Sequence, residues 1–510
     1  MKSRSVGLIL SYINTFLSMI TGLFLSAFYI ARLGDTEYGV YQTIASFANY
    51  LVLLEFGTGT VMSRNISICR AKNASKEEIE KNVSTIWSIT NILSLIILLV
   101  SVIFYLCIGS IYVNSLTAQQ IASGKNMFIF ITVYLLASFY SQTLNGITLA
   151  YEDYTYSSKL SIIKTVSRTA LLVILLLNFN QAIFIAIVDA TINIIIATVT
   201  YIYCKKKFNI KINLKNFDKV IFKSSIPLCL ALFLQAIMNQ ANNNVDKFII
   251  GVVLNPETVT LYSVALYIYS IFSSLTTIPI SMYGPQVTRD VVSGIRGKDL
   301  TDKLVQPNRL IVLIGGTILG GFFAVGRQFI SIVYGEEYLL AWIIALILMV
   351  PMFINMTTAI ALNVLDAMNK RLARSFALFF TTILNIVLTI FFLQWYGVVG
   401  AAVATAISLI LGNVIIMDIY YSRSIGLKIM YMYYKTYKGI VIYQLLGAGI
   451  AYFVGTLIAN VWLSFVVGGV LFLVISFSGF LLFGKSVAEK EMINKFVNKL
   501  TRKNKKENEV

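Results

Sequence analysis

The chain contains no histidine, and only four of its 510 residues are cysteine. Histidine is the commonest metal ligand and the side chain that most readily titrates near neutral pH, so its absence removes the usual metal sites and proton shuttles. The cysteines lack the spacing of a zinc site and the pattern of a disulfide framework. They are Cys69, Cys107, Cys204 and Cys229.

Charged residues are also scarce: they make up 13% of the chain, whereas apolar residues make up 57%. This composition, with a mean hydropathy of +0.79, excludes an ordinary soluble domain. Apolar segments of about 20 residues recur, which is the length that an α-helix needs to cross a bilayer. We therefore predict an all-α polytopic membrane protein with about 14 transmembrane helices. The expected spans are 6–31, 40–62, 83–108, 126–150, 160–178, 182–203, 224–254, 259–283, 310–333, 339–365, 375–395, 398–420, 439–461 and 463–483.

Lysine and arginine outnumber aspartate and glutamate by 41 to 23, which gives a net charge of +18. In a membrane protein this excess indicates basic cytoplasmic loops rather than a nucleic-acid partner. The positive-inside rule then places both termini in the cytoplasm, with an even number of spans between them. No cleavage site follows the first residues, so we expect the first apolar helix to be retained. The basic loops are 64–81, 205–223, 289–309, 370–374 and 423–438.

A lysine-rich segment divides the first twelve spans into two halves of six. Leu144-Asn145 recurs as Leu362-Asn363, and 201–203 aligns with 419–421 at the same offset along the chain. Chance is one explanation of this match. Two parallel six-helix lobes, a recurring transporter plan, are the other. The predicted organisation is an N-lobe at 1–204, a cytoplasmic connector at 205–223, a C-lobe at 224–421, a cytoplasmic loop at 422–438, two further spans at 439–483 and a basic amphipathic tail at 484–510 that would bind anionic headgroups.

The stretch 235–251, QAIMNQANNNVDKFIIG, places polar residues inside an apolar segment. A charge at the bilayer centre costs roughly 2.5–3.5 kcal/mol, so such residues usually face another helix or a watery cavity. Asp246 and Lys247 have an alternative place at the outer interface, where lysine can snorkel. The prediction is that the polar side chains touch water or sugar rather than lipid. They are Gln235, Asn239, Asn242, Asn243 and Asp246.

Other ionisable residues fall inside or near the ends of the expected spans. Lys164 and Arg168 stand four residues apart and so share one helix face. For each residue, pairing with a neighbouring helix explains the position as well as ligand contact does. As a group they predict a hydrated, partly cationic cavity between the lobes, whose ligand is anionic. The complete set of candidates is Arg32, Glu55, Lys164, Arg168, Asp189, Gln235, Asn239, Asn242, Asn243, Asp246 and Lys247.

Residues 479–486, GFLLFGKS, fit the P-loop pattern letter for letter. That chemistry requires a loop after a strand, whose amides cradle phosphate. Here the pattern lies at the end of an apolar span, so we predict that it binds no nucleotide. No catalytic constellation and no metal-ligand spacing appears elsewhere, and we expect neither an enzyme nor a cofactor.

Four motifs resemble a known family. They are ARLGDTEYGVY at 31–41, NNVDKFIIG at 243–251 followed by LYSVA at 261–265, YGEEY at 334–338, and GVVGAAVAT at 397–405. Their order and spacing are similar to those of the polysaccharide transporter branch of the MOP superfamily, the Wzx-type flippases. This resemblance implies two six-helix lobes facing a central cavity, with an extra pair of C-terminal helices.

The resemblance also implies a function. Such proteins move undecaprenyl-pyrophosphate-linked oligosaccharide across the bacterial cytoplasmic membrane, by alternating access in our hypothesis. The implied partners are this lipid-linked oligosaccharide, membrane lipids, a polysaccharide polymerase and glycosyltransferases. Charged cavity residues handle sugar and pyrophosphate in this family. The positions that could fill this role are Arg32, Lys164, Arg168, Asp246 and Lys247.

The driving force has two explanations. The membrane potential favours export of an anion by roughly 2.3 kcal/mol per charge per 100 mV. Alternatively, Asp246, Glu55 or Asp189 could couple export to H⁺ or Na⁺. The competing functions are a MATE-type drug antiporter, which favours an acidic cavity, and a lipid II flippase. A membrane glycosyltransferase or polymerase is a third alternative, but its long extramembrane regions are missing from the predicted spans and loops.

Overall fold

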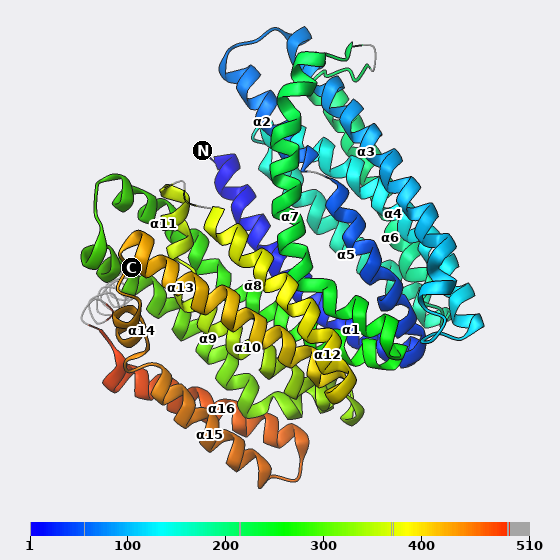
Figure 1. Ribbon diagram of the computed structural model, residues 1–510. Coiled ribbons are helices and arrows are strands. Elements are labelled where there is room, and N and C mark those ends of the chain that lie inside the picture. The colour runs from blue at the N-terminus through cyan, green and yellow to red at the C-terminus, as the bar shows by residue number, and fades with distance from the viewer. Residues whose placement is uncertain are drawn as a thin grey trace, which may run out of the picture. The chain divides into compact units, whose positions relative to one another are not determined.

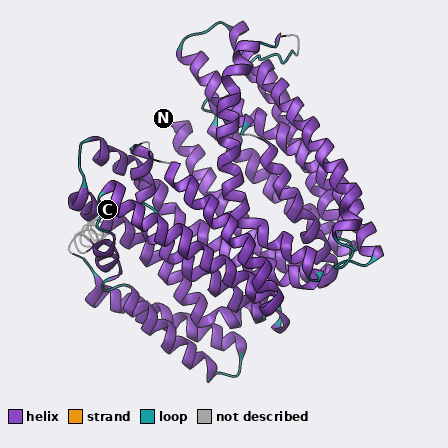
Figure 2. Ribbon diagram, viewed as in Figure 1, coloured by secondary structure: helices purple, strands orange, loops and turns teal. Residues whose placement is uncertain are grey.

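The computed structural model describes the chain except residues 1, 56, 214–215, 369, 371, 487–488 and 490–510, and except some further side chains, which include those of 234–244. Within the described residues every regular element is a helix, as the colouring of Figure 2 illustrates. The prediction of an all-α protein is therefore confirmed. Most of the predicted amphipathic tail lies outside the described residues.

By internal contacts the chain divides into two compact units, Met1–Val264 and Ala265–Val510. The first holds all the helices labelled α1 to α7 in Figure 1, and α8 (Pro256–Val292) contains the division point. Several of these helices begin at a side-chain cap: Ser75 caps α3, a Thr117–Gln120 capping box starts α4, and Asp153 caps α5. The elements of unit 1 are α1 (Lys2–Leu51), the 3₁₀ turn η1 (Val52–Glu55), α2 (Thr58–Ala71), α3 (Lys76–Ile111), α4 (Ala118–Ala150), α5 (Tyr154–Asn178), α6 (Ile183–Lys207) and α7 (Lys219–Val253).

The second unit has less regular helices. Its last long helices, α15 and α16, lie side by side as a hairpin against α9 (Figure 1). The elements after α8 are α9 (Gly297–Val333), η3 (Glu336–Tyr338), α10 (Leu340–Thr358), α11 (Ala361–Ala367), α12 (Leu372–Leu409), the π-helix η4 (Ile410–Ile416), α13 (Met417–Tyr420), the π-helix η5 (Tyr421–Ile425), α14 (Ile429–Tyr437), α15 (Val441–Thr456), α16 (Val461–Gly479) and the π-helix η6 (Phe480–Gly484).

Ten helices in the described residues are long and apolar enough to cross a membrane, or eleven if the bent pair α14–α15 counts as one span. The chain is thus a multi-span membrane protein, whereas the count of fourteen stays a prediction. Two of the ten are each interrupted by a glycine with positive φ, Gly34 in α1 and Gly397 in α12. Glycine adopts this backbone without the penalty that a side chain brings. Both glycines fall where the sequence predicts a boundary between consecutive spans.

Helix α2 extends beyond the predicted second span. That span is predicted to end at 62, whereas α2 ends at Ala71. Basic residues of the predicted loop 64–81, such as Arg70, therefore lie on a helix. Arg70 donates to the carbonyl oxygen of Ala150 (2.5 Å) and lies over the Tyr151 ring. A lysine or arginine near the end of a span can continue the helix because its charge reaches the interface along a long stem.

The motif at 31–41 joins α1 to the hairpin between α7 and α8. After the break at Gly34, the Thr36 hydroxyl donates to Glu257 (2.6 Å), and the Thr260 hydroxyl donates to the carbonyl oxygen of Asp35 (2.8 Å). Gly39 packs so closely on Pro256 that an added Cβ would lie 2.1 Å from the Pro256 carbonyl oxygen. These contacts explain why the start of α8 belongs to unit 1. They also explain why the boundary between the two units lies within α8 and not at the lysine-rich connector.

Asn145 and Asn363 are 218 residues apart. The same offset also aligns ends of elements in unit 1 with ends of elements in unit 2. Under this repeat offset, the start of α4 meets the start of η3, the start of α5 meets the start of α12, and the end of α6 meets the end of η5. Helix ends are set by caps and turns spread along the chain, so their agreement at a single offset is not explained by two matching pairs of letters. The structure therefore favours an internal repeat over a chance match.

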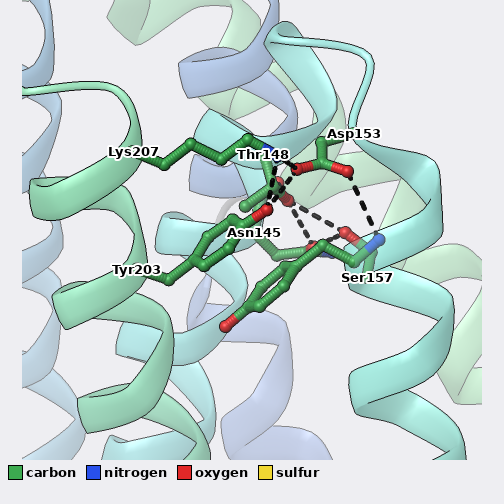
Figure 3. A network of polar contacts seen from close by, with 7 residues as sticks. Asn145, Thr148, Asp153, Ser157, Tyr203 and Lys207 are labelled. Atoms are coloured by element: carbon green, nitrogen blue, oxygen red, sulfur yellow. Dashed lines mark hydrogen bonds and ion pairs between the residues drawn. The ribbon is translucent and has the colours of Figure 1, made fainter.

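A polar network closes the turn between α4 and α5 (Figure 3). Asp153 accepts hydrogen bonds from Lys207 (2.6 Å) and Tyr203 (2.5 Å) on α6. A second group lies beside it, in which Ser157 and Thr148 both donate to the side-chain oxygen of Asn145 (2.7 and 2.9 Å). Burial raises the pKa of Asp153, but the bonds from Lys207 and Tyr203 outweigh it and hold the pKa below its usual 3.8.

In unit 2, Arg309 of α9 attaches the C-terminal helices. Its guanidinium donates twice to Glu489 (2.8 and 3.0 Å) and also to the carbonyl oxygens of Lys435, Lys438 and Gly484 (3.0, 2.8 and 2.7 Å). These bonds use every N–H of the side chain, which is 5% exposed. The sequence places Arg309 in a basic loop, but in the fold its charge is committed to packing.

Replacing Arg309 with alanine should lower the free energy of unfolding by about 3–5 kcal/mol, because Glu489 would be left without its cation. The measurement is thermal unfolding of the purified protein followed by tryptophan fluorescence. The control is Arg423→Ala, which removes an exposed cation from the same unit. Equal unfolding midpoints for both variants would contradict the role assigned to Arg309.

The same ion pair should respond to acid. Burial raises the pKa of Glu489, but its bonds from Arg309 and the Ser486 amide outweigh burial and lower the pKa below 4.5. The pair therefore stabilises the fold above about pH 4.5 and ceases to do so as pH falls through the lower folded pKa. We expect Glu489→Gln to lose less stability than the wild type between pH 6 and pH 3, a trend that unfolding midpoints at each pH can check.

Candidate functional site

Two antiparallel helices of unit 1, α5 and α6, share a ladder of polar side chains. Arg168 on α5 forms a two-pronged ion pair with Asp189 on α6, with one N–H to each carboxylate oxygen. One turn along, the Lys164 ammonium donates to the side-chain oxygen of Asn193 (2.8 Å). The spacing of four residues on both helices aligns these rungs. The structure therefore brings together three of the predicted candidates, Lys164, Arg168 and Asp189.

The polar face of α5 continues toward α1. Asn14 of α1 donates to the Ser161 hydroxyl (2.9 Å), and Thr165 donates back to the Asn14 side-chain oxygen (3.4 Å). Ser161, Lys164, Thr165 and Arg168 thus form one stripe along α5. Inside apolar helices such a stripe is stable only if each group has a partner, because an unmade hydrogen bond there costs several kcal/mol.

A cavity of about 260 Å³ adjoins the Arg168–Asp189 pair. Four tyrosines contribute to its walls, with Tyr29, Tyr38 and Tyr41 from α1 and Tyr134 from α4. Tyrosine offers both a flat apolar face and a hydroxyl, which suits a ligand with apolar and polar sides such as a sugar ring. The volume is slightly below the roughly 300–1,000 Å³ of most ligand pockets, so one ring or one phosphate is the size that fits.

The charges of the ladder do not cancel, although the two charged residues that line the cavity, Arg168 and Asp189, pair with each other. Asp189 neutralises Arg168, whereas Lys164 is bonded to the neutral Asn193. Arg168 keeps 31% of its side chain exposed and Asp189 keeps 14%. A site with a surplus positive charge and a partly accessible guanidinium favours an anionic or hydroxyl-rich ligand.

The remaining candidates lie elsewhere in unit 1. Arg32 is exposed beside the ring of Phe28 and does not line the tyrosine cavity. Glu55 belongs to η1 and faces the side chain of Gln142. Lys247 is half-buried on α7. The structure does not bring these residues to the ladder.

Asp246 is 6% exposed and accepts a hydrogen bond from the Tyr262 hydroxyl (2.9 Å). This bond lies within the protein, and contact of Asp246 with water or sugar stays a prediction. The side chains of Gln235, Asn239, Asn242 and Asn243 lie outside the described part of the structure. For these four the sequence prediction stays a prediction.

Sequence reasoning missed the tyrosines of the cavity. Tyr38 and Tyr41 stand three residues apart within the motif at 31–41, hence on one helix face, and Gln42 and Asn49 stand seven apart. From this spacing the sequence alone could have predicted that these side chains share one helix face. Only the fold shows that Tyr134, from a different helix, completes the wall.

The P-loop pattern at 479–486 lies in a helical setting. Residues 480–484 form the π-helix η6, and the Gly484 carbonyl oxygen accepts a bond from Arg309. Gly484 packs against Gly439, where an added Cβ would be 2.1 Å from a carbonyl oxygen. Close packing therefore explains this glycine. Over the described residues, no group of three or more His, Cys, Asp or Glu side chains is arranged to hold a metal ion.

Comparison with known proteins places these features in a wider group. The family model described as "Polysaccharide biosynthesis protein" matches residues 6–285. The probable low-salt glycan biosynthesis flippase Agl15 of Haloferax volcanii is 25% identical over 188 residues, which cover 36% of this chain and 39% of that relative's length.

Solved structures share the fold at low identity. Lipid II flippase MurJ in an inward closed conformation gives a TM-score of 0.73 at 16% identity, over 92% of this chain and 99% of that one. An inward-facing multidrug resistance MATE transporter of the MOP superfamily gives 0.57 at 13% identity, over 81% and 96%. The Vibrio cholerae MATE transporter VcmN gives 0.55 at 12% identity, over 83% and 98%. The chain therefore has the fold that these transporters share.

The Arg168–Asp189 pair should show strong energetic coupling. In a double-mutant cycle of Arg168→Gln and Asp189→Asn we expect a coupling energy of about 1–3 kcal/mol, because the bonds are charged and two-pronged. Unfolding of the two single variants, the double variant and the wild type supplies the cycle. A control cycle of Lys159→Gln with Asp189→Asn should be additive, since Lys159 is exposed at the other end of α5. Additivity in both cycles would show that the pair is energetically unimportant.

Proposed function

Because the chain belongs to the polysaccharide biosynthesis protein family, we propose that it is a flippase for a lipid-linked oligosaccharide. The match of the family model to residues 6–285 carries this proposal. The name of the Haloferax volcanii relative agrees with it, although that match spans 39% of the relative's length. The matched relative and the matched structures are named as flippases or transporters rather than enzymes, in agreement with the prediction that this chain is not an enzyme.

The proposed cargo is an undecaprenyl-pyrophosphate-linked oligosaccharide, the repeat unit of an O-antigen, capsule or exopolysaccharide. The ladder supports an anionic cargo, since Lys164 supplies a charge that Asn193 does not neutralise. The adjoining tyrosines support a sugar-bearing one, because their rings and hydroxyls suit the two kinds of surface on a sugar ring. In this proposal Arg168 and Lys164 contact the phosphate or acidic sugar, and Asp189 holds Arg168 in position.

The direction of transport follows from electrostatics. With both termini in the cytoplasm of a bacterium, as the positive-inside rule predicts, export moves negative charge out of a negative interior. Each charge gains roughly 2.3 kcal/mol per 100 mV, so a cargo with about two negative charges gains roughly 5 kcal/mol. Alternating access driven by the membrane potential is therefore sufficient in principle, and coupling to H⁺ or Na⁺ at Asp246, Glu55 or Asp189 is the alternative.

Lipid II is the competing cargo, because the fold is shared with MurJ over nearly all of that chain. A multidrug antiporter fits less well. Its cationic drugs favour an acidic cavity, whereas the ladder described here carries a surplus positive charge.

Cargo identity can be tested in a deletion strain. We expect lipid-linked repeat units to accumulate on the cytoplasmic face of the membrane, with lipid II distribution unchanged, and plasmid-borne protein to restore export. Lipid II accumulation instead would replace the proposed cargo with the competing one. An unchanged distribution of both lipids would contradict a flippase function for either.

Lys164→Gln should reduce export about tenfold in that strain. Glutamine can still donate to Asn193, so the change removes the charge while a hydrogen bond remains, and tenfold corresponds to about 1.4 kcal/mol. The matched control is Lys159→Gln, which removes an exposed charge from the same helix. Full export by Lys164→Gln, at equal protein abundance, would refute a role for the cationic ladder.

A further inference from the structure

A pocket of about 300 Å³ lies at one end of unit 2, and the proposed function does not use it. It is bounded by the end of α9, the η3 turn and the hairpin of α15 and α16, which are labelled in Figure 1. The polar residues that line it include Arg327, Gln328 and Ser331 of α9, Glu336 of η3, Thr456 of α15 and Ser464 of α16.

Two of the described lining residues are charged, Arg327 and Glu336, and they do not pair with each other. Both side chains are exposed. Within the described residues neither takes part in a hydrogen bond or an ion pair. This differs from the tyrosine cavity of unit 1, where the two lining charges, Arg168 and Asp189, neutralise each other. Two separate charges of opposite sign on one pocket favour a ligand that itself carries both signs.

The corresponding turn of unit 1 has no such charges. That turn joins α3 to α4, as the turn at η3 joins α9 to α10, and residues 111–120 around it include no charged side chain. The hairpin of α15 and α16 packs on α9 of unit 2. The two charges therefore occur on the repeat against which the hairpin packs.

One wall of the pocket is fixed by the hairpin. The Gln328 amide donates to the Ser464 hydroxyl (2.9 Å), which donates in turn to the carbonyl oxygen of Gly455 (2.8 Å). The side-chain oxygen of Gln328 is buried and accepts no hydrogen bond from the described groups. A buried acceptor without a donor is unfavourable, so this wall suits a ligand that carries N–H groups.

The pocket lies at the end of α9 that is farther from the basic segments. Helix α9 begins at Gly297, within the basic segment 289–309, and the pocket is at its other end. The positive-inside rule predicts that this end faces away from the cytoplasm. Trp462, which follows the lining residue Val461, is exposed here, and exposed tryptophan is typical of the membrane–water interface. We therefore expect the pocket at the level of the lipid headgroups.

Apolar surface adjoins the pocket. Phe453 and Leu457 directly follow the lining residues Tyr452 and Thr456, and both are exposed. In a membrane such side chains contact lipid tails. The volume of the pocket is at the lower limit of the roughly 300–1,000 Å³ of most ligand pockets, which suits a headgroup rather than a whole lipid.

The unpaired carboxylate discriminates between headgroups. An anionic headgroup, or the pyrophosphate of the proposed cargo, is attracted by Arg327 but repelled by Glu336. A headgroup with a phosphate and a primary ammonium satisfies both, because guanidinium N–H groups match phosphate oxygens and a carboxylate accepts from an ammonium. We propose that this pocket binds the headgroup of such a zwitterionic phospholipid, with Arg327 as the contact to phosphate and Glu336 as the contact to ammonium.

Calorimetry with purified full-length protein in uncharged detergent tests the proposal. The probe is dihexanoyl phosphatidylethanolamine. Dihexanoyl phosphatidylglycerol keeps the phosphate without the ammonium, and dihexanoylglycerol lacks both groups. All measurements use the Lys164→Gln background, so that phosphate binding at the ladder of unit 1 contributes little. We expect the ethanolamine lipid to bind about tenfold more tightly than the glycerol lipid, because charge-assisted hydrogen bonds to Glu336 are made by the ammonium alone.

Two variants locate the binding. Arg327→Gln should weaken binding of the ethanolamine lipid about tenfold, since it removes the cation that contacts phosphate. Glu336→Gln should weaken it by a similar factor and abolish the preference over phosphatidylglycerol. The matched control is Glu337→Gln, which removes an exposed carboxylate from the same turn that does not line the pocket. This control should leave the affinity unchanged.

Both pocket charges are exposed, and either variant keeps the test valid if the other fails to fold. Absence of binding by the ethanolamine lipid, equal affinity for phosphatidylglycerol, unchanged affinity in the folded pocket variants, or an equal loss in Glu337→Gln would overturn the proposal. None of these measurements involves export, so the result is independent of the proposed flippase function.

Discussion

Polar groups inside apolar helices must find partners within the protein, and this requirement governs much of the structure. The charge of Arg168 is stabilised between α5 and α6 because Asp189 accepts two hydrogen bonds from its guanidinium. The charge of Arg309, which is 5% exposed, is stabilised because Glu489 and three carbonyl oxygens accept bonds from all its N–H groups. Each pairing also joins segments distant in sequence. The same interactions that offset the desolvation of a charge therefore specify which helices pack together.

The two units reuse one helical plan with different side chains. Element ends agree at the single repeat offset, so the repeat preserves where helices start and stop. At the basic end, unit 1 fills its interior with the Tyr156–Tyr203 stack and the network around Asp153. Unit 2 has Arg374 in place of the first tyrosine, a broken helix and a π-helical turn around a cavity. A repeat of this kind allows the two halves to keep one helical plan while the side chains around it diverge.

Much of the candidate site could be predicted from the chain alone. Lys164 and Arg168 were identified because charges four residues apart in an apolar span are costly, and the motif at 31–41 was recognised by its letters. The packing of Gly39 on Pro256 now explains part of that motif. The tyrosine cavity was not predicted, because its wall combines α1 with α4 and such contacts leave no local pattern. The bond from Tyr262 to Asp246 was not predicted either, because it joins two consecutive helices.

The sequence by itself determined that this is a helical multi-span membrane protein of a recognisable family, and which polar residues interrupt its apolar segments. These properties depend on composition and on spacing along one helix, both of which are local. The tertiary structure decided which of those residues meet, as Arg168 meets Asp189 and Arg309 meets Glu489. Such pairings depend on how helices pack across long sequence separations, because a charge in an apolar environment is stabilised by its neighbours in space and not by its neighbours in the chain.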